Sequence, residues 1–181
     1  MKRKVIALML ALLMILAACG SPTGKINDKV VGSWAFNHDD TTEFAEFRDD
    51  GTAVYDGKKY TYTTDDTFII LKDKNGSETK LRYEMTQKGM NLCRIQTYVR
   101  MDGSDGIVGY WLDEINSWTF EFTEAGTFRE DGAFTGHYAT GSNGELKLMY
   151  ERSFEDTLCY YTIEGDKIII EYPWPMVKTA K

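Results

Sequence analysis

The chain has 181 residues, of which 43% are hydrophobic and 27% are charged, and this ordinary globular composition excludes a wholly disordered chain and a multi-span membrane protein. Its net charge of −7 argues against a nucleic-acid partner, because phosphate binding needs a basic face. Aromatic residues make up 13% of the chain, and 16 glycines stand against only 3 prolines, which favours strands joined by tight turns.

The beginning of the chain has the three-part pattern of an export signal. Residues 2–4 are basic, residues 5–16 form an unbroken apolar run, and residues 16–20 read LAACG. The apolar run is too short for a membrane-spanning helix, and small residues before a cleavage site are what a signal peptidase accepts. Because a cysteine follows that site directly, the segment resembles the lipobox of bacterial lipoproteins. An ordinary secretory signal with a coincidental cysteine is the alternative.

This resemblance implies that residues 1–18 are a lipoprotein signal peptide and that the Cys19 thiol is acylated, with palmitate among its chains. Residues 19–28 would then comprise the lipidated cysteine and a short tether. Several acyl chains on one residue hold a protein stably at a membrane. We therefore expect a lipid-anchored protein on the extracytoplasmic face of the cell membrane. Removal of the basic residues 2–4 would carry the net charge from −7 to −10.

The remainder of the chain repeats itself once. Three short motifs recur in the same order about 75 residues later: 31–34 (VGSW) at 108–111 (VGYW), 46–52 (EFRDDGT) at 121–127 (EFTEAGT), and the Asp-Gly pair of 56–57 at 131–132. Each match alone is weak, but their common order indicates a duplication.

The composition between the copies marks a boundary. Residues 101–106 (MDGSDG) have the composition of a linker. We predict a first domain over residues 29–100, a second over residues 107–175, and a tail over residues 176–181. Domains of this size bury only about 60% of the surface that their unfolded chains expose, so the two copies are expected to pack on each other.

Turn-forming dipeptides punctuate both copies at short intervals. Asparagine or aspartate next to glycine supplies the positive φ angles that two-residue hairpin loops need, as at 50–51, 56–57, 75–76, 143–144 and 165–166. Residues 59–63 and 79–85 alternate in polarity, which predicts strands with one buried face. No convincing amphipathic helix follows the signal segment, so an antiparallel sheet is expected. The Pro-Trp-Pro segment 173–175 is expected to stay outside any central strand, because proline cannot donate to the ladder.

A Gly-x-Trp motif opens each copy, and a strand that ends in Gly-Thr follows it. The chain is therefore similar to the small lipocalin-like domains of bacterial surface lipoproteins, on the motifs Gly32-Ser33-Trp34, Phe47–Thr52, Gly109-Tyr110-Trp111 and Phe122–Thr127. The resemblance implies an all-β fold of two tandem antiparallel meander small barrels after an N-terminal helical signal peptide. Closure into a barrel would remove exposed sheet edges. Many such domains have no assigned activity, so the resemblance carries over no functional residue.

Trp34 and Trp111 are the candidate ligand-binding residues, since each would form the floor of an apolar pocket. The alternative is that each plugs its barrel, because large aromatic side chains dominate small cores. Short strands leave little interior space, which favours the plug. Trp174 either packs on the outside of its domain or is exposed as a contact.

Cys93 and Cys159 remain after Cys19 is lipidated. Export makes a disulfide between them feasible, and such a bridge would staple the two copies with about 4 kcal/mol of stabilisation. The alternative is two buried free thiols that behave as small hydrophobic residues. The free thiols are slightly favoured over the disulfide, since the two cysteines are not at equivalent positions of the repeat.

No motif in the chain indicates catalysis, a metal or a cofactor. The two histidines, His38 and His137, have no metal-ligand spacing and do not align in the repeat. Calcium would need alternating oxygen ligands, and only Asp102 with Asp105 offers a weak candidate. No Gly-x-Ser-x-Gly elbow is present. We therefore expect no catalytic residues, no metal and no cofactor.

These observations predict a membrane-anchored, extracytoplasmic, non-enzymatic binding or interaction module, whose partner is a surface protein or a small apolar ligand. The alternative is a carrier that holds a small apolar molecule inside a β-barrel. A hydrolase with a site between the copies is the weakest interpretation, and it would require a carboxylate or histidine with a strongly shifted pKa.

Overall fold

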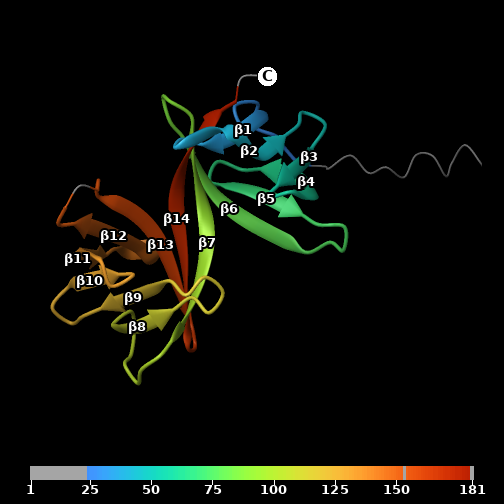
Figure 1. The fold of residues 1–181 in the computed structure, drawn as a ribbon. Coiled ribbons are helices and arrows are strands. Elements are labelled where there is room, and N and C mark those ends of the chain that lie inside the picture. Colours follow the sequence, from blue (N-terminus) through green and yellow to red (C-terminus); the bar gives the residue numbers. More distant parts are fainter. Residues whose placement is uncertain (1–23, 153, 180–181) are drawn as a thin grey trace, which may run out of the picture. The chain divides into compact units, whose positions relative to one another are not determined.

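The computed structural model describes residues 24–152 and 154–179, and every regular element longer than one turn in this part is an antiparallel strand (Figure 1). The expectation of an all-β fold without a helix in this part of the chain is confirmed. The signal segment and Cys19 lie outside the described residues. Within the described part, no helix is long and apolar enough to cross a membrane.

The described chain forms two compact units. Unit 1 contains residues 39–80 together with residues up to Ala35 and from Lys178 onward, and unit 2 contains Phe36–His38 and Leu81–Val177. Most of unit 1 is built from five strands and the beginning of a sixth: β1 (Gly32–Phe36), β2 (Asp39–Phe47), β3 (Thr52–Tyr55), β4 (Lys58–Thr64), β5 (Phe68–Lys72) and β6 (Glu78–Met85).

Unit 2 continues the same meander. Its strands after β6 are β7 (Met90–Arg100), β8 (Gly109–Leu112), β9 (Thr119–Phe122), β10 (Thr127–Glu130), β11 (Phe134–Thr140), β12 (Glu145–Tyr150), β13 (Thr157–Glu164) and β14 (Lys167–Lys178), with a one-turn 3-10 helix at Ser142–Gly144. The segment 101–106, expected as a linker between domains, connects β7 to β8 within unit 2.

Strand pairing follows chain order and closes into a ring through β1 and β14. An additional ladder joins β14 to β7, with Lys167 opposite Val99 at one end and Met176 opposite Met90 at the other. This ladder closes β7 through β14 into a ring of their own, because each of these strands also pairs with its sequence neighbour.

Alternating side chains build the walls. In β4, Tyr62 and Thr64 are buried while Thr61 between the tyrosines is exposed, and in β6 the buried pair is Leu81 and Tyr83. The hairpin between β3 and β4 turns at Asp56 and Gly57, with φ of 47° and 70°, and the turn after β10 has nearly the same angles at Asp131 and Gly132, 49° and 68°. The alternation and the Asp-Gly turns predicted from the sequence are thus confirmed.

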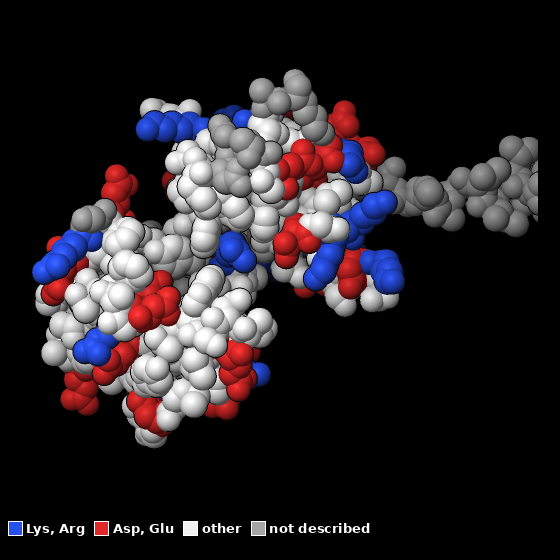
Figure 2. Space-filling model, viewed as in Figure 1, with Lys and Arg blue, Asp and Glu red and all other residues white. Residues whose placement is uncertain are grey.

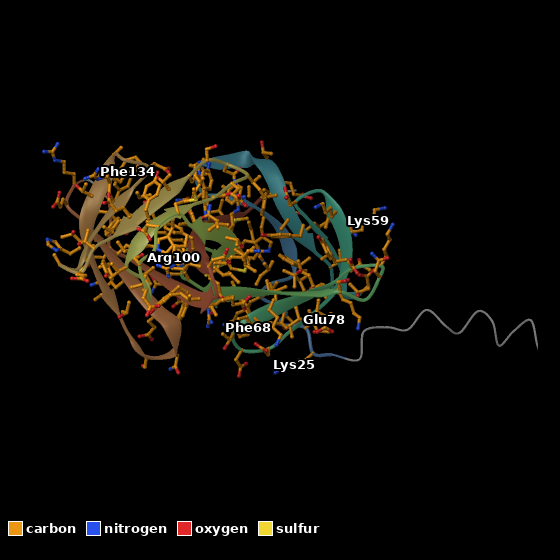
Figure 3. All side chains as sticks on the ribbon, turned by 90° about the horizontal axis from the view of Figure 1, so that it is seen from below. Lys25, Lys59, Phe68, Glu78, Arg100 and Phe134 are labelled. Atoms are coloured by element: carbon orange, nitrogen blue, oxygen red, sulfur yellow. The ribbon has the colours of Figure 1, made fainter. Side chains whose placement is uncertain are left out.

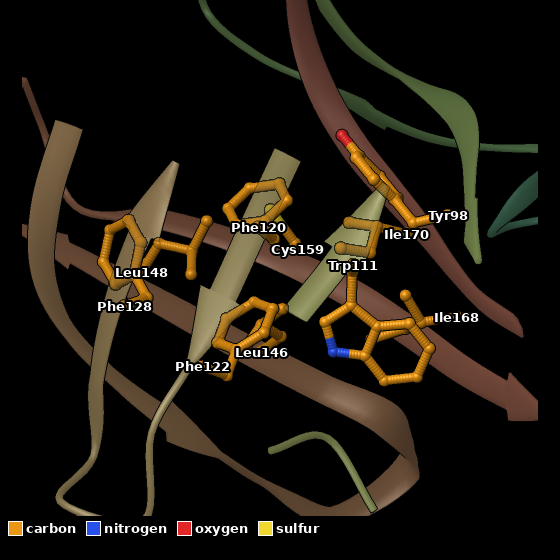
Figure 4. Close-up of a cluster of buried hydrophobic side chains, with 10 residues drawn as sticks. All are labelled: Tyr98, Trp111, Phe120, Phe122, Phe128, Leu146, Leu148, Cys159, Ile168 and Ile170. Carbon is orange, nitrogen blue, oxygen red and sulfur yellow. The ribbon is translucent and has the colours of Figure 1, made fainter. Parts of the chain in front are cut away.

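The core of unit 2 fills the inside of its ring with aromatic and aliphatic side chains (Figure 4). The buried cluster consists of Tyr98, Trp111, Phe120, Phe122, Phe128, Leu146, Leu148, Cys159, Ile168 and Ile170. Each large apolar side chain that is fully buried contributes about 1.5–3 kcal/mol. β11 adds no side chain to this cluster at Gly136, because a Cβ there would collide with the Phe128 ring and the Met149 backbone.

The expectation that the Pro-Trp-Pro segment avoids a central strand is wrong. Pro173 and Pro175 lie within β14, opposite Cys93 and Asn91 of β7. The Pro175 carbonyl accepts a hydrogen bond from the Asn37 N–H, so this edge of Pro175 faces away from β7. In an antiparallel strand the N–H and C=O of one residue point the same way, and residues two apart agree. Both prolines therefore turn their missing N–H groups away from β7, beyond the point where the β13 ladder ends at Glu171.

Candidate ligand-binding site

The two tryptophans that open the repeats have the same local geometry. Trp34 is 1% exposed and its indole N–H donates to the Val30 carbonyl at 2.8 Å, while Trp111 is 0% exposed and donates to the Ile107 carbonyl at 2.9 Å. Each stands two residues after a glycine with a φ near 140°, an angle that only glycine adopts without strain.

A cation covers each of these rings. The Lys178 Nζ lies 5.2 Å from the Trp34 ring centroid, and the Arg100 Cζ lies 4.1 Å from that of Trp111. The Arg100 guanidinium also donates to the Val108 and Gly106 carbonyls. Both tryptophans are therefore buried, hydrogen-bonded and covered by a cation, which favours the plug over the floor of a ligand pocket.

Cys93 and Cys159 are free and buried in the structure, on β7 and β13 of unit 2. Burial raises the pKa of the Cys93 thiol to about 12, and it raises the pKa of the Cys159 thiol as well. These surroundings fit the alternative of two unreactive thiols.

The polar residues singled out from the sequence do not converge. His38 stacks on Phe36, with ring centroids 5.6 Å apart, and His137 is exposed on β11. The Asp102 carboxylate accepts hydrogen bonds from the Ser104 hydroxyl and the Tyr110 N–H, so it organises the loop before β8. Within the described ranges, no group of histidines, cysteines and carboxylates could hold a metal ion.

Trp174 is half-buried and packs against aromatic and basic side chains of unit 2. Its ring centroid lies 5.1 Å from that of Phe36 and 5.1 Å from the Arg94 Cζ. Its buried indole N–H has no hydrogen-bond partner among the described residues.

A polar network joins the ends of two strands of unit 2 to the middle of a third. The Tyr150 hydroxyl donates to the Glu130 carboxylate at 2.7 Å and lies 3.1 Å from the Tyr172 hydroxyl. These residues come from β10, β12 and β14. Each stands two positions after a buried core residue, namely Phe128, Leu148 and Ile170.

Glu130 lacks a cationic partner. No lysine or arginine of the described residues forms an ion pair with it. Desolvation raises the pKa of Glu130, the hydrogen bond from Tyr150 lowers it, and the charge of Asp131 raises it. Burial also raises the pKa values of Tyr150 and Tyr172. The network thus carries one carboxyl group in an environment of phenols and aromatic rings.

The Tyr150 ring also lines a pocket of about 230 Å³ that opens to solvent. The pocket is lined by Ala133, Phe134, Thr135, Tyr150, Arg152 and Phe154. Phe134 is 41% exposed and Phe154 is 55% exposed, and Figure 3 places Phe134 at the periphery of unit 2, well apart from Arg100. Tyr150 therefore connects an exposed aromatic pocket to the carboxyl group of Glu130.

The aromatic rings of the pocket contact one another at their edges. The centroids of Phe134 and Phe154 are 5.2 Å apart in a T-shaped pair, and those of Tyr150 and Phe154 are 5.5 Å apart. Phe128 and Tyr150 form another T-shaped pair, with ring centroids 5.1 Å apart.

The charged side chains around the pocket have defined partners on the outer face. The Glu151 carboxylate accepts a hydrogen bond from the Thr135 hydroxyl, and Arg129 pairs with Glu121 at 3.8 Å. These side chains border a second depression of about 290 Å³ that shares Thr135 with the pocket. Arg152 is the basic residue of the pocket, and its side chain is exposed.

Sequence reasoning missed Glu130, Tyr150 and Tyr172. The signal that could have found them is the period of two along each strand, which continues the inward positions 128, 146–148 and 168–170 to these residues. A glutamate next to a turn is ordinarily solvated, so its residue type predicts an exposed side chain. The strand alternation predicts an inward side chain at the same position, and here the alternation is the better guide.

Comparisons with known proteins add no relative, since no family model, no curated protein and no solved structure matches the chain.

Proposed function

We propose that the chain is a membrane-anchored extracytoplasmic lipoprotein that acts as a non-enzymatic binding module. The pattern of residues 2–20, which ends in Leu-Ala-Ala-Cys-Gly, supports the anchor at Cys19. An acidic, all-β domain held at a membrane by acyl chains is suited to meeting ligands or partners outside the cell.

A second part of the proposal is that the scaffold is a tandem pair of small lipocalin-like barrels. The Tyr62 hydroxyl donates to the Arg48 carbonyl, and the Tyr138 hydroxyl donates to the Thr123 carbonyl, each at 3.0 Å. These contacts, the two Gly-x-Trp sites and the two Asp-Gly turns occur in the same order along the chain. Such agreement in side-chain and backbone detail supports a duplication.

The pocket of Phe134, Tyr150, Arg152 and Phe154 is the proposed binding site. The single observation that carries this assignment is that Tyr150, which lines the pocket beside two exposed phenylalanines, hydrogen-bonds the partly buried carboxyl group of Glu130. A small number of polar groups beside apolar and aromatic surface is the usual composition of a small-molecule site. The pocket belongs to the second copy, since Tyr55 stands in the first copy at the position of Glu130.

The test uses three ligands of nearly the same shape and different charge: choline, 3,3-dimethylbutan-1-ol and 3,3-dimethylbutanoate. Each is titrated into the mature protein, purified in a non-ionic detergent from an exporting host, at constant ionic strength. We expect at least one of them to shift the backbone amide resonances of residues 134, 150, 152 and 154. Absence of any shift at the pocket with all three would contradict the proposed site.

Native mass spectrometry of the same preparation tests the carrier alternative. A bare protein mass is expected for a module that binds weakly at an open pocket. A ligand that survives buffer exchange and leaves on denaturation would instead assign the protein as a carrier.

A further inference from the structure

We propose that the pocket of unit 2 binds an organic ammonium ion, with Glu130 as the counter-charge behind the Tyr150 ring. This inference rests on the proposed function, which assigns the same pocket without naming the class of ligand. It follows from three features of the described residues: a carboxylate without a counter-ion, a set of aromatic rings, and the distribution of charge.

The first feature is the carboxylate without a counter-ion. One oxygen of Glu130 accepts a hydrogen bond from the Tyr150 hydroxyl, and the other has no hydrogen-bond partner among the described residues and is not fully buried. A carboxylate that is partly withdrawn from water and has no counter-ion interacts more strongly with a bound cation than a fully solvated carboxylate does. The fold thus holds a negative charge that a ligand can neutralise.

The second feature is the aromatic lining. Cations are attracted to the faces of aromatic rings, and cages of two or three rings recognise ammonium groups that carry methyl or methylene substituents. Phe134, Tyr150 and Phe154 supply three rings around one pocket. The hydrogen bond from Tyr150 to Glu130 polarises the phenol, which makes its ring face more negative. Through this polarisation, Glu130 makes the electrostatic potential at the pocket more negative although its carboxylate does not line the pocket.

The third feature is the surrounding charge. The chain is acidic, and Figure 2 shows carboxylates spread over the face in view with fewer basic side chains between them. Such a field raises the local concentration of cations. Arg152 is the opposing charge, but its side chain is exposed and its repulsion is screened by water.

Arg152 also defines the rival interpretation, in which the pocket takes an anion. That interpretation would make Arg152 the recognition residue and Glu130 a repulsive one. The two interpretations predict opposite signs for the same pair of substitutions, so they can be separated.

The experiment is the titration above, carried out on the mature protein and four variants. Choline is expected to bind more tightly than its neutral analogue 3,3-dimethylbutan-1-ol. E130Q keeps an acceptor for the Tyr150 hydroxyl but removes the charge, and it should weaken choline binding about tenfold while leaving the neutral analogue unchanged. R152Q should strengthen choline binding about threefold, because it removes a like charge.

Two further variants control for a loss of choline binding that is caused only by a loss of folded structure. F154L keeps an apolar contact at an exposed position but removes a ring face, and it should weaken choline binding about threefold without affecting the neutral analogue. E164Q removes a carboxylate from an exposed position at the far end of β13, and it should leave choline binding unchanged. Dispersed amide spectra establish that each variant is folded.

The outcomes separate the two proposals. Tighter binding of 3,3-dimethylbutanoate that is lost in R152Q would overturn the ammonium ligand and keep the pocket as a binding site. Equal binding of choline and the neutral analogue, or equal choline binding by E130Q and the wild type, would do the same. Failure of all three compounds to shift the pocket resonances would overturn both the ligand class and the proposed site.

Discussion

Glu130 couples the chemistry of the pocket to the stability of unit 2. Its pKa is raised in the folded state by desolvation, so the folded protein holds this proton more tightly than the unfolded chain does. Glu130 therefore contributes stability that is fully present below its unfolded pKa and is lost as the pH rises through its folded pKa.

The first prediction concerns this pH dependence. The free energy of unfolding of the wild type should fall relative to that of E130Q as the pH rises from about 4 to about 7. Urea denaturation at a series of pH values measures the difference, with E164Q as the matched control because its carboxylate is exposed. Parallel pH profiles of the wild type and E130Q would show that Glu130 is ionised equally in both states.

The two cysteines give a second prediction at this scale. Cys93 is 5% exposed and Cys159 is 0% exposed, and burial raises both thiol pKa values. Neither thiol should react with a thiol-specific reagent in the native protein, and both should react after denaturation without a reductant. A disulfide lacks the two thiol hydrogen atoms. A protein mass that is lower by two hydrogen atoms before reduction than after it would therefore contradict this expectation.

At the scale of the element, β11 shows how one glycine permits a packed interior. Gly136 has ordinary backbone angles, but a side chain there would collide with the Met149 carbonyl and the Phe128 ring. We expect Gly136→Ala to lower the free energy of unfolding by about 1–3 kcal/mol relative to the wild type, because the core must shift to accept the methyl group. Chemical denaturation measures this change.

Gly103 offers the matched control for that substitution. A Cβ at Gly103 meets open space, and the backbone there requires no positive φ. Gly103→Ala should change the free energy of unfolding by no more than about 0.5–1 kcal/mol, and in the stabilising direction. Equal losses from the two variants would mean that Gly136 is not packed as described.

Much of the element structure could be predicted from the sequence, because hairpins are local. The Asp-Gly turns at 56–57 and 131–132 and the alternation in β4 were visible in the residues themselves. The pairing of β14 with β7 was not visible, because it joins residues far apart and includes two prolines whose orientation decides whether they are tolerated. The same holds for Glu130, whose partner Tyr150 lies 20 residues away on another strand.

At the scale of the whole molecule, the proposed anchor gives the fourth prediction. Cys19→Ala should abolish incorporation of labelled palmitate and move the protein from the detergent phase to the aqueous phase on phase separation. A Cys93→Ala variant is the control, since it retains the lipidated position. Unchanged partitioning of Cys19→Ala would contradict the anchor and favour an ordinary secretory signal.

The last strand has a consequence for the order of folding. Lys178 at the end of β14 belongs to unit 1, where its Nζ donates to the Val31 carbonyl across 147 residues of sequence and covers the Trp34 ring. Contacts between such distant residues form slowly, because the intervening chain must first be closed into a loop. A chain delivered N-terminus first would therefore leave unit 1 incomplete until Lys178 arrived. The first part to emerge would be the last to mature, and a chain that is cut short would lose the cover of Trp34 in the unit it had already made.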